Sequence, residues 1–100
     1  MSWIPSEQRL ESGLWRGETH MQQKEWFAAY RAFLTAARAA EGDDLELARG
    51  LVHAAAAGYK RLVGDERGAA RQLAHARRRL APYLPASRGI DLEDMLSGLS

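Results

Sequence analysis

The sequence predicts an all-α protein, folded as a compact antiparallel bundle of four to five helices. Three observations support this prediction. Apolar residues recur three and four positions apart along most of the chain, which is the spacing of one helix face. Glycine, proline and capping residues divide this pattern into segments with short connections, and such connections make successive helices pack as antiparallel neighbours. No segment alternates apolar and polar residues as a half-buried strand does.

Length and composition indicate one globular domain over residues 1–100, with 1–18 as an N-terminal extension or short helix and 19–96 as the helical core. The chain is 46% hydrophobic and 27% charged, with a net charge of +1, which disfavours a dedicated nucleic-acid or membrane binder. The absence of cysteine excludes disulfides and thiolate metal sites. There is no basic leader followed by an apolar run and no apolar stretch of about 20 residues, so we expect a cytoplasmic protein without a membrane partner.

Local start and stop signals place the first two helices. The first is expected to open at Pro5-Ser6-Glu7 and to end at Gly17. Thr19 stands three residues before Gln22, the spacing of a capping box. A second helix is therefore expected from about residue 20 to residue 40, with Gly42 as the glycine that stops it.

Acidic residues mark the starts of the remaining helices. Asp43 or Asp44 is expected to cap a third helix that extends to Val63. Asp65 and Glu66 open a fourth, which continues to about residue 80, where prolines follow. A terminal helix begins after residue 91, where another aspartate can serve as its cap.

Helical spacing assigns a buried face to each of the long helices. An aromatic stripe at this spacing is typical of a protein core rather than of a working site. On the second helix the expected core face holds Trp26, Tyr30, Phe33, Leu34 and Ala37, with Phe27 at its margin. On the third it holds Leu47, Leu51, Val52, Ala55, Tyr59, Leu62 and Val63, and on the fourth Ala69, Leu73, Ala76 and Leu80.

The stretch RGLVHAAAAGYKRLVGDERGAARQL, followed by GIDLEDML, resembles the domain-of-unknown-function 309 family of small bacterial and archaeal proteins. The resemblance covers roughly residues 26–96 and implies a compact all-helical fold. Members carry a His-Glu-x-x-Glu-x-x-Trp signature whose His and Glu are suspected metal ligands. The positions that keep the family register are Gly50, Gly64, Gly68, Ala69, Gly89, Ile90 and Asp91.

The signature itself is missing from this chain. In the family register its histidine falls on Tyr30, its two acids on Arg31 and Leu34, and its tryptophan on Ala37. A protonated tyrosine is a poor ligand and a leucine is none, so the resemblance implies a degenerate site without metal or cofactor.

A polar edge on the third helix keeps a second possibility open. Glu46, Arg49 and His53 recur at i, i+3 and i+7, and the register places Tyr30 nearby. They form either a remodelled polar pocket, in which His53 titrates near neutrality, or a solvated face with one ion pair. The second interpretation is favoured.

Two further clusters of chemically active residues are weaker candidates. Arg67, Arg71 and Arg78 form one stripe on the fourth helix, a candidate anion-binding surface. No aromatic residue is interleaved with them for base stacking, so nucleic-acid binding is not expected. The three histidines, at positions 20, 53 and 75, lie on different predicted helices without metal-binding spacing, so no metal site is predicted.

The sequence therefore favours a non-enzymatic scaffold or protein-interaction module that binds a protein partner or forms a homodimer. Trp3, Ile4 and Trp15 are the apolar residues expected to pack on a second copy. The alternative is a metal-dependent or small-molecule-binding enzyme with a relocated polar site around His53.

Overall fold

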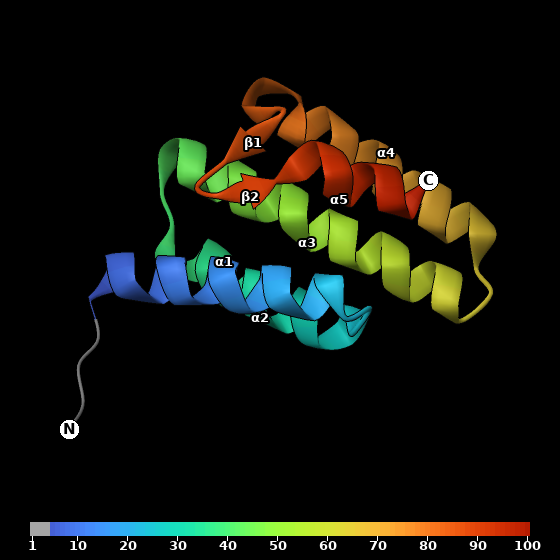
Figure 1. The fold of residues 1–100 in the computed structure, drawn as a ribbon, viewed down its shortest axis with the longest axis horizontal. Coiled ribbons are helices and arrows are strands. Elements are labelled where there is room, and N and C mark those ends of the chain that lie inside the picture. Colours follow the sequence, from blue (N-terminus) through green and yellow to red (C-terminus); the bar gives the residue numbers. More distant parts are fainter. Residues whose placement is uncertain (1–4) are drawn as a thin grey trace.

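Consecutive helices pack against one another in chain order, and the C-terminal segment folds back over them (Figure 1). The computed structural model describes residues 5–100, and over these residues it contains five α-helices, one short 3-10 helix and one two-stranded antiparallel sheet. The predicted all-α class is confirmed. No helix of this range has the length and apolar character to cross a membrane. The elements are α1 (Ser6–Gln22), α2 (Trp26–Ala39), α3 (Gly42–Leu62), α4 (Glu66–Leu80), η1 (Ala81–Tyr83), β1 (Ala86–Ser87), β2 (Ile90–Asp91) and α5 (Leu92–Leu99).

The boundary between the first two helices differs from the prediction. α1 does not end at Gly17 but continues to Gln22, so residues 18 and 19 both lie inside it. The expected capping box is absent, because the Thr19 hydroxyl donates to the carbonyl oxygen of Trp15 within the same helix, at 3.0 Å. The turn between the helices instead includes Lys24, whose φ of 60° lies in the left-handed region.

The observed starts of the later helices agree better with the starts predicted from the sequence. The Asp65 carboxylate accepts a hydrogen bond from the backbone N–H of Gly68 at 2.8 Å, and Asp91 accepts one from Asp94 at 2.9 Å. The predicted helix start at Asp65 and the predicted cap at Asp91 are therefore confirmed, and Asp65 also caps its helix. The cap of α3 is Glu41, without a side-chain hydrogen bond, so the expected Asp43 or Asp44 cap is wrong. Those two acids lie in the first turn, where the helix dipole favours negative charge.

The interior is built largely from alanine and glycine, which let the helix backbones approach closely. A Cβ added at Gly17 would lie 2.2 Å from Cε1 of Phe33, and one added at Gly13 would lie 2.8 Å from the carbonyl oxygen of Ala32. Gly17 therefore accommodates α2 rather than ending α1. The largest fully buried side chains are Phe33, Leu10, Leu47, Leu51, Leu80 and Leu92.

This close packing moves the buried faces away from the predicted ones. On α2 the buried residues are Ala29, Ala32, Phe33 and Ala36, while Trp26 and Tyr30 are half-buried. On α3 the predicted burial is correct at Leu47 and Leu51, but it is wrong at the C-terminal end of the helix. Small side chains fill the space between the helices there and leave large ones outside. The exposed large residues on α2, on α3 and just after it are Phe27, Tyr59, Leu62 and Val63.

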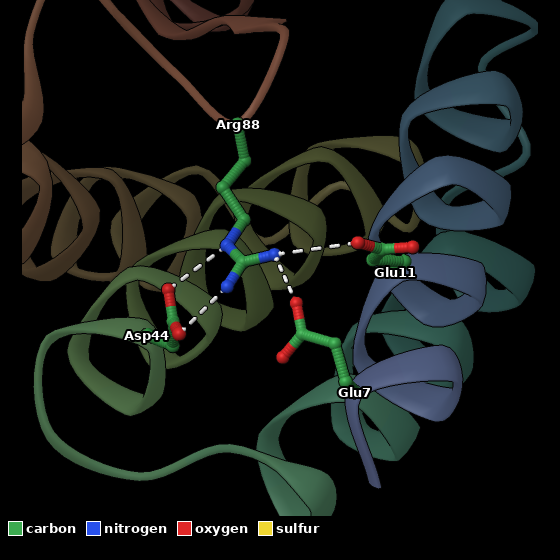
Figure 2. Close-up of polar contacts among 4 residues, drawn as sticks. All are labelled: Glu7, Glu11, Asp44 and Arg88. Atoms are coloured by element: carbon green, nitrogen blue, oxygen red, sulfur yellow. Dashed lines mark hydrogen bonds and ion pairs between the residues drawn. The ribbon is translucent and has the colours of Figure 1, made fainter. Parts of the chain in front are cut away.

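Arg88 joins the C-terminal hairpin to two helices (Figure 2). It occupies the two-residue β1–β2 turn with Gly89, and both residues have positive φ, as a type I′ turn requires. Its guanidinium binds both carboxylate oxygens of Asp44 on α3, at 2.8 and 3.0 Å, and Glu7 of α1 at 2.9 Å. Glu11 lies 4.0 Å away. The hydrogen bonds to Asp44, and then those to Glu7, raise the pKa of Arg88.

We predict that Gly17→Ala lowers the free energy of unfolding by about 1–3 kcal/mol, because the new Cβ must displace a fully buried ring. The matched control is Gly98→Ala in α5, where a Cβ meets nothing within 4 Å and the better helix propensity of alanine raises stability by up to about 1 kcal/mol. Urea unfolding followed by circular dichroism measures both. Equal stability of the two variants would contradict the tight contact.

We predict that Arg88→Gln lowers the free energy of unfolding by about 1 kcal/mol at low salt, because a two-sided charge-assisted contact is lost at the surface. The difference from the parent protein is expected to shrink in about 1 M salt, where the Debye length is about 3 Å. An equal loss at both salt concentrations would instead assign the effect to packing of the hairpin.

Candidate functional site

A groove of about 440 Å³ crosses the surface formed by α2, α3 and α4. Each helix contributes side chains through its regular spacing, because residues three, four and seven apart lie on the same side of a helix. We call this the aromatic groove. It is lined by Phe27 and Tyr30 of α2, by Val52, His53, Ala56, Tyr59 and Lys60 of α3, and by Gln72 of α4.

Three aromatic rings form one side of the aromatic groove. The ring of Phe27 stacks on that of Tyr30, with centroids 6.4 Å apart and planes 15° apart. The same Phe27 ring lies 6.1 Å from Tyr59 at a tilt of 49°. These are favourable aromatic geometries, so the rings hold one another in place. Phe27 is nevertheless 58% exposed and Tyr59 41% exposed.

The opposite side of the groove is polar and is built around His53. Its Nδ1 lies 2.7 Å from Oε1 of Gln72, a contact that joins α3 to α4. The His75 ring lies behind it, with centroids 5.1 Å apart. Partial burial lowers the pKa of His75, and the nearby charges of His53 and then Arg78 lower it further.

The predicted polar pocket forms only in part. Tyr30 and His53 line the same groove, although they come from different helices. Glu46 and Arg49 do not take part in it. Glu46 instead binds Arg79 of α4 at 2.8 Å and lies 3.5 Å from Arg49, so these residues form a surface ion-pair cluster.

The other sequence candidates lie elsewhere. Arg67, Arg71 and Arg78 are exposed along α4, and no ion pair to them is formed within residues 5–100. Among those residues no three His, Asp or Glu side chains come close enough together to hold a metal ion. Trp15 is 67% exposed on α1, whereas Trp3 and Ile4 lie outside the described residues.

Sequence reasoning missed several groove residues. Phe27 and Tyr59 were expected at or near the core, whereas both line one surface depression. Gln72 was not considered, because its contact with His53 spans 19 residues and no local spacing reveals it.

The aromatic groove combines an apolar surface with a polar edge. No carboxylate lines it, and the group that contacts Nδ1 of His53 is the amide oxygen of Gln72. Aromatic rings and one amide–imidazole contact provide a surface for recognition.

No family model, curated protein or solved structure matches this chain. The resemblance to the domain-of-unknown-function 309 family therefore remains a prediction, and the groove must be interpreted from its own geometry.

We predict that stability falls as the pH is lowered from about 7.5 to 5.5, partly through His75. Its pKa is lower in the folded state than the value of about 6.5 in an unfolded chain, so the unfolded chain binds a proton first as the pH falls. His75→Gln removes this contribution, so the variant should lose less stability than the parent over the same range. Parallel urea titrations at the two pH values measure the difference, and identical losses would contradict the assignment.

Proposed function

We propose that the protein is a non-enzymatic protein-interaction module, and that the aromatic groove binds an amphipathic helix of a partner protein. The observation that carries this proposal is the row of rings exposed along the groove, centred on Phe27. Tyrosine and phenylalanine are enriched at the centres of protein interfaces, where they are buried against a partner. We also propose that the protein belongs to the family that its sequence resembles and that it is cytoplasmic.

The shape of the surface favours a helix as the ligand. Val52, Ala56 and Tyr59 follow one another at intervals of four and three residues, so they form one apolar stripe on α3, and Val63 directly after the helix extends it. The ends of this stripe are eleven residue steps apart, a rise of about 16 Å, which equals about three turns of a ligand helix. A helix lying along the stripe can pack its own row of side chains between the rings of α2 and the polar edge of α4.

Charge favours a partner with acidic flanks. Of the residues that line the groove, Lys60 alone carries a full charge at neutral pH, and it lies 3.7 Å from Asp65 at the edge. Pairing the grooves of two copies would bring two Lys60 side chains into an interface whose lining offers no carboxylate. This favours a different protein over a groove-to-groove homodimer. A homodimer through Trp15, on another surface, remains the second proposal.

The proposal is tested with two synthetic amphipathic helices of about 18 residues, each with leucines on one face and either glutamates or lysines beside them. We predict that the glutamate peptide binds and shifts the amide NMR signals of groove residues, while the lysine peptide binds more weakly. Phe27→Ser should raise the Kd at least about tenfold, because an exposed ring at the centre of an interface is a typical hot spot.

The matched control is Trp15→Ser, which removes an equally exposed ring outside the groove and should leave the Kd unchanged. Light scattering of the same samples reports the oligomeric state. If neither peptide binds, or both variants weaken binding equally, the aromatic groove is not the docking site.

A further inference from the structure

We propose that a second depression, on the surface between α1 and α2, binds a small oligophosphate anion. This depression, the arginine groove, has a volume of about 500 Å³. Arg16 of α1 and both Arg31 and Arg38 of α2 line it, together with His20, Leu34 and Thr35. It lies outside the aromatic groove and does not depend on the function proposed for that site.

The close contact between α1 and α2 brings these arginines together. At Gly13 the two backbones are so near that a Cβ would lie 2.8 Å from the carbonyl oxygen of Ala32. Arg16 is one turn beyond Gly13, and Arg31 immediately precedes Ala32, so the same contact places both guanidinium groups beside one depression. Arg38 follows Arg31 on the same face, about 10 Å further along the helix axis.

The charges in the arginine groove are not compensated by the protein. Elsewhere in the described part of the chain, Arg49, Arg61, Arg79 and Arg88 are each paired with a carboxylate, whereas the arginines at 67, 71 and 78 are not and do not share a depression. Within residues 5–100 no ion pair is formed to the three arginines of the groove, and no carboxylate lines it. The carboxylate of Glu25 lies 2.8 Å from Nδ1 of His20, which lines the groove. Three like charges around one depression repel one another, and a bound anion relieves that repulsion.

Phosphate chemistry fits this site better than a single carboxylate does. The planar guanidinium forms two parallel hydrogen bonds to a phosphate, and three such groups match a ligand with several negative oxygens. A volume of this size accommodates a small organic ligand. The apolar part of the floor is Leu34 with two alanines, and no aromatic ring lines the depression. The site therefore recognises the phosphate chain and does not distinguish one nucleobase from another.

The experiment measures binding of inorganic triphosphate, ATP and GTP by calorimetry, at low salt and without magnesium, using protein purified without an affinity tag. We expect saturable binding of triphosphate, with Kd values for ATP and GTP within about threefold of it because the base is not contacted. Arg16→Gln and Arg31→Gln should each raise the Kd for triphosphate at least about tenfold. Both side chains are exposed, so the fold is retained, and thermal unfolding checks this.

The matched control is Arg71→Gln on α4, which removes the same charge from an exposed arginine outside the groove. It should change the Kd by less than about twofold. The proposal is overturned if triphosphate does not bind at millimolar concentration, or if Arg71→Gln weakens binding as much as Arg31→Gln. It is also overturned if duplex DNA binds more tightly than triphosphate and all three variants reduce that binding equally, because the protein would then carry a diffuse polyanion-binding surface.

Discussion

Close approach of the helix backbones is the constraint on which the rest of this structure depends. Gly17 lies directly under the ring of Phe33, Gly58 lies under Trp26, and alanine fills much of the remaining space. Interiors are packed to a fixed density, so helices this near to one another leave little room for large side chains between them. Among the described residues Phe33 is the one aromatic side chain that is fully buried. The aromatic groove and the arginine groove thus have the same origin: tight packing excludes the other rings from the interior and brings Arg16 close to the arginines of α2.

Some signals that act within a few residues could be interpreted correctly from the sequence, although the capping box at Thr19 and the expected cap of α3 could not. The helix start at Asp65, the cap at Asp91 and the buried face of α4 depend on hydrogen bonds and spacing inside one helix, and the structure confirms them. The end of α1 was misjudged because a glycine in a helix has two explanations. Its low helix propensity suggests termination, whereas its lack of a side chain permits a close tertiary contact. Only the position of Phe33 decides between them.

The aromatic residues were misjudged for a related reason. Burial preferences describe how strongly a ring avoids water, but not whether a core has space for it. Phe27 and Tyr59 are apolar enough for an interior and yet line the surface. Tyr30 and His53 were expected to lie near each other, and both line the same groove. The partners of His53 could not be anticipated, because Gln72 and His75 belong to α4 and no local spacing connects them to α3. The arginine groove could not be anticipated either, because it combines residues from two helices that were each considered alone.

The bonds that Arg88 makes have a consequence for the order in which the molecule is assembled on the ribosome. Its partner Glu7 is 81 residues earlier in the chain, so this bond cannot form until nearly the whole described segment has been synthesised and has left the exit tunnel. α1 and α2 are adjacent along the chain and can associate as a helical pair much sooner. Arg88 therefore forms its contacts late in synthesis: it joins α1 to a turn that leaves the ribosome after α2, α3 and α4.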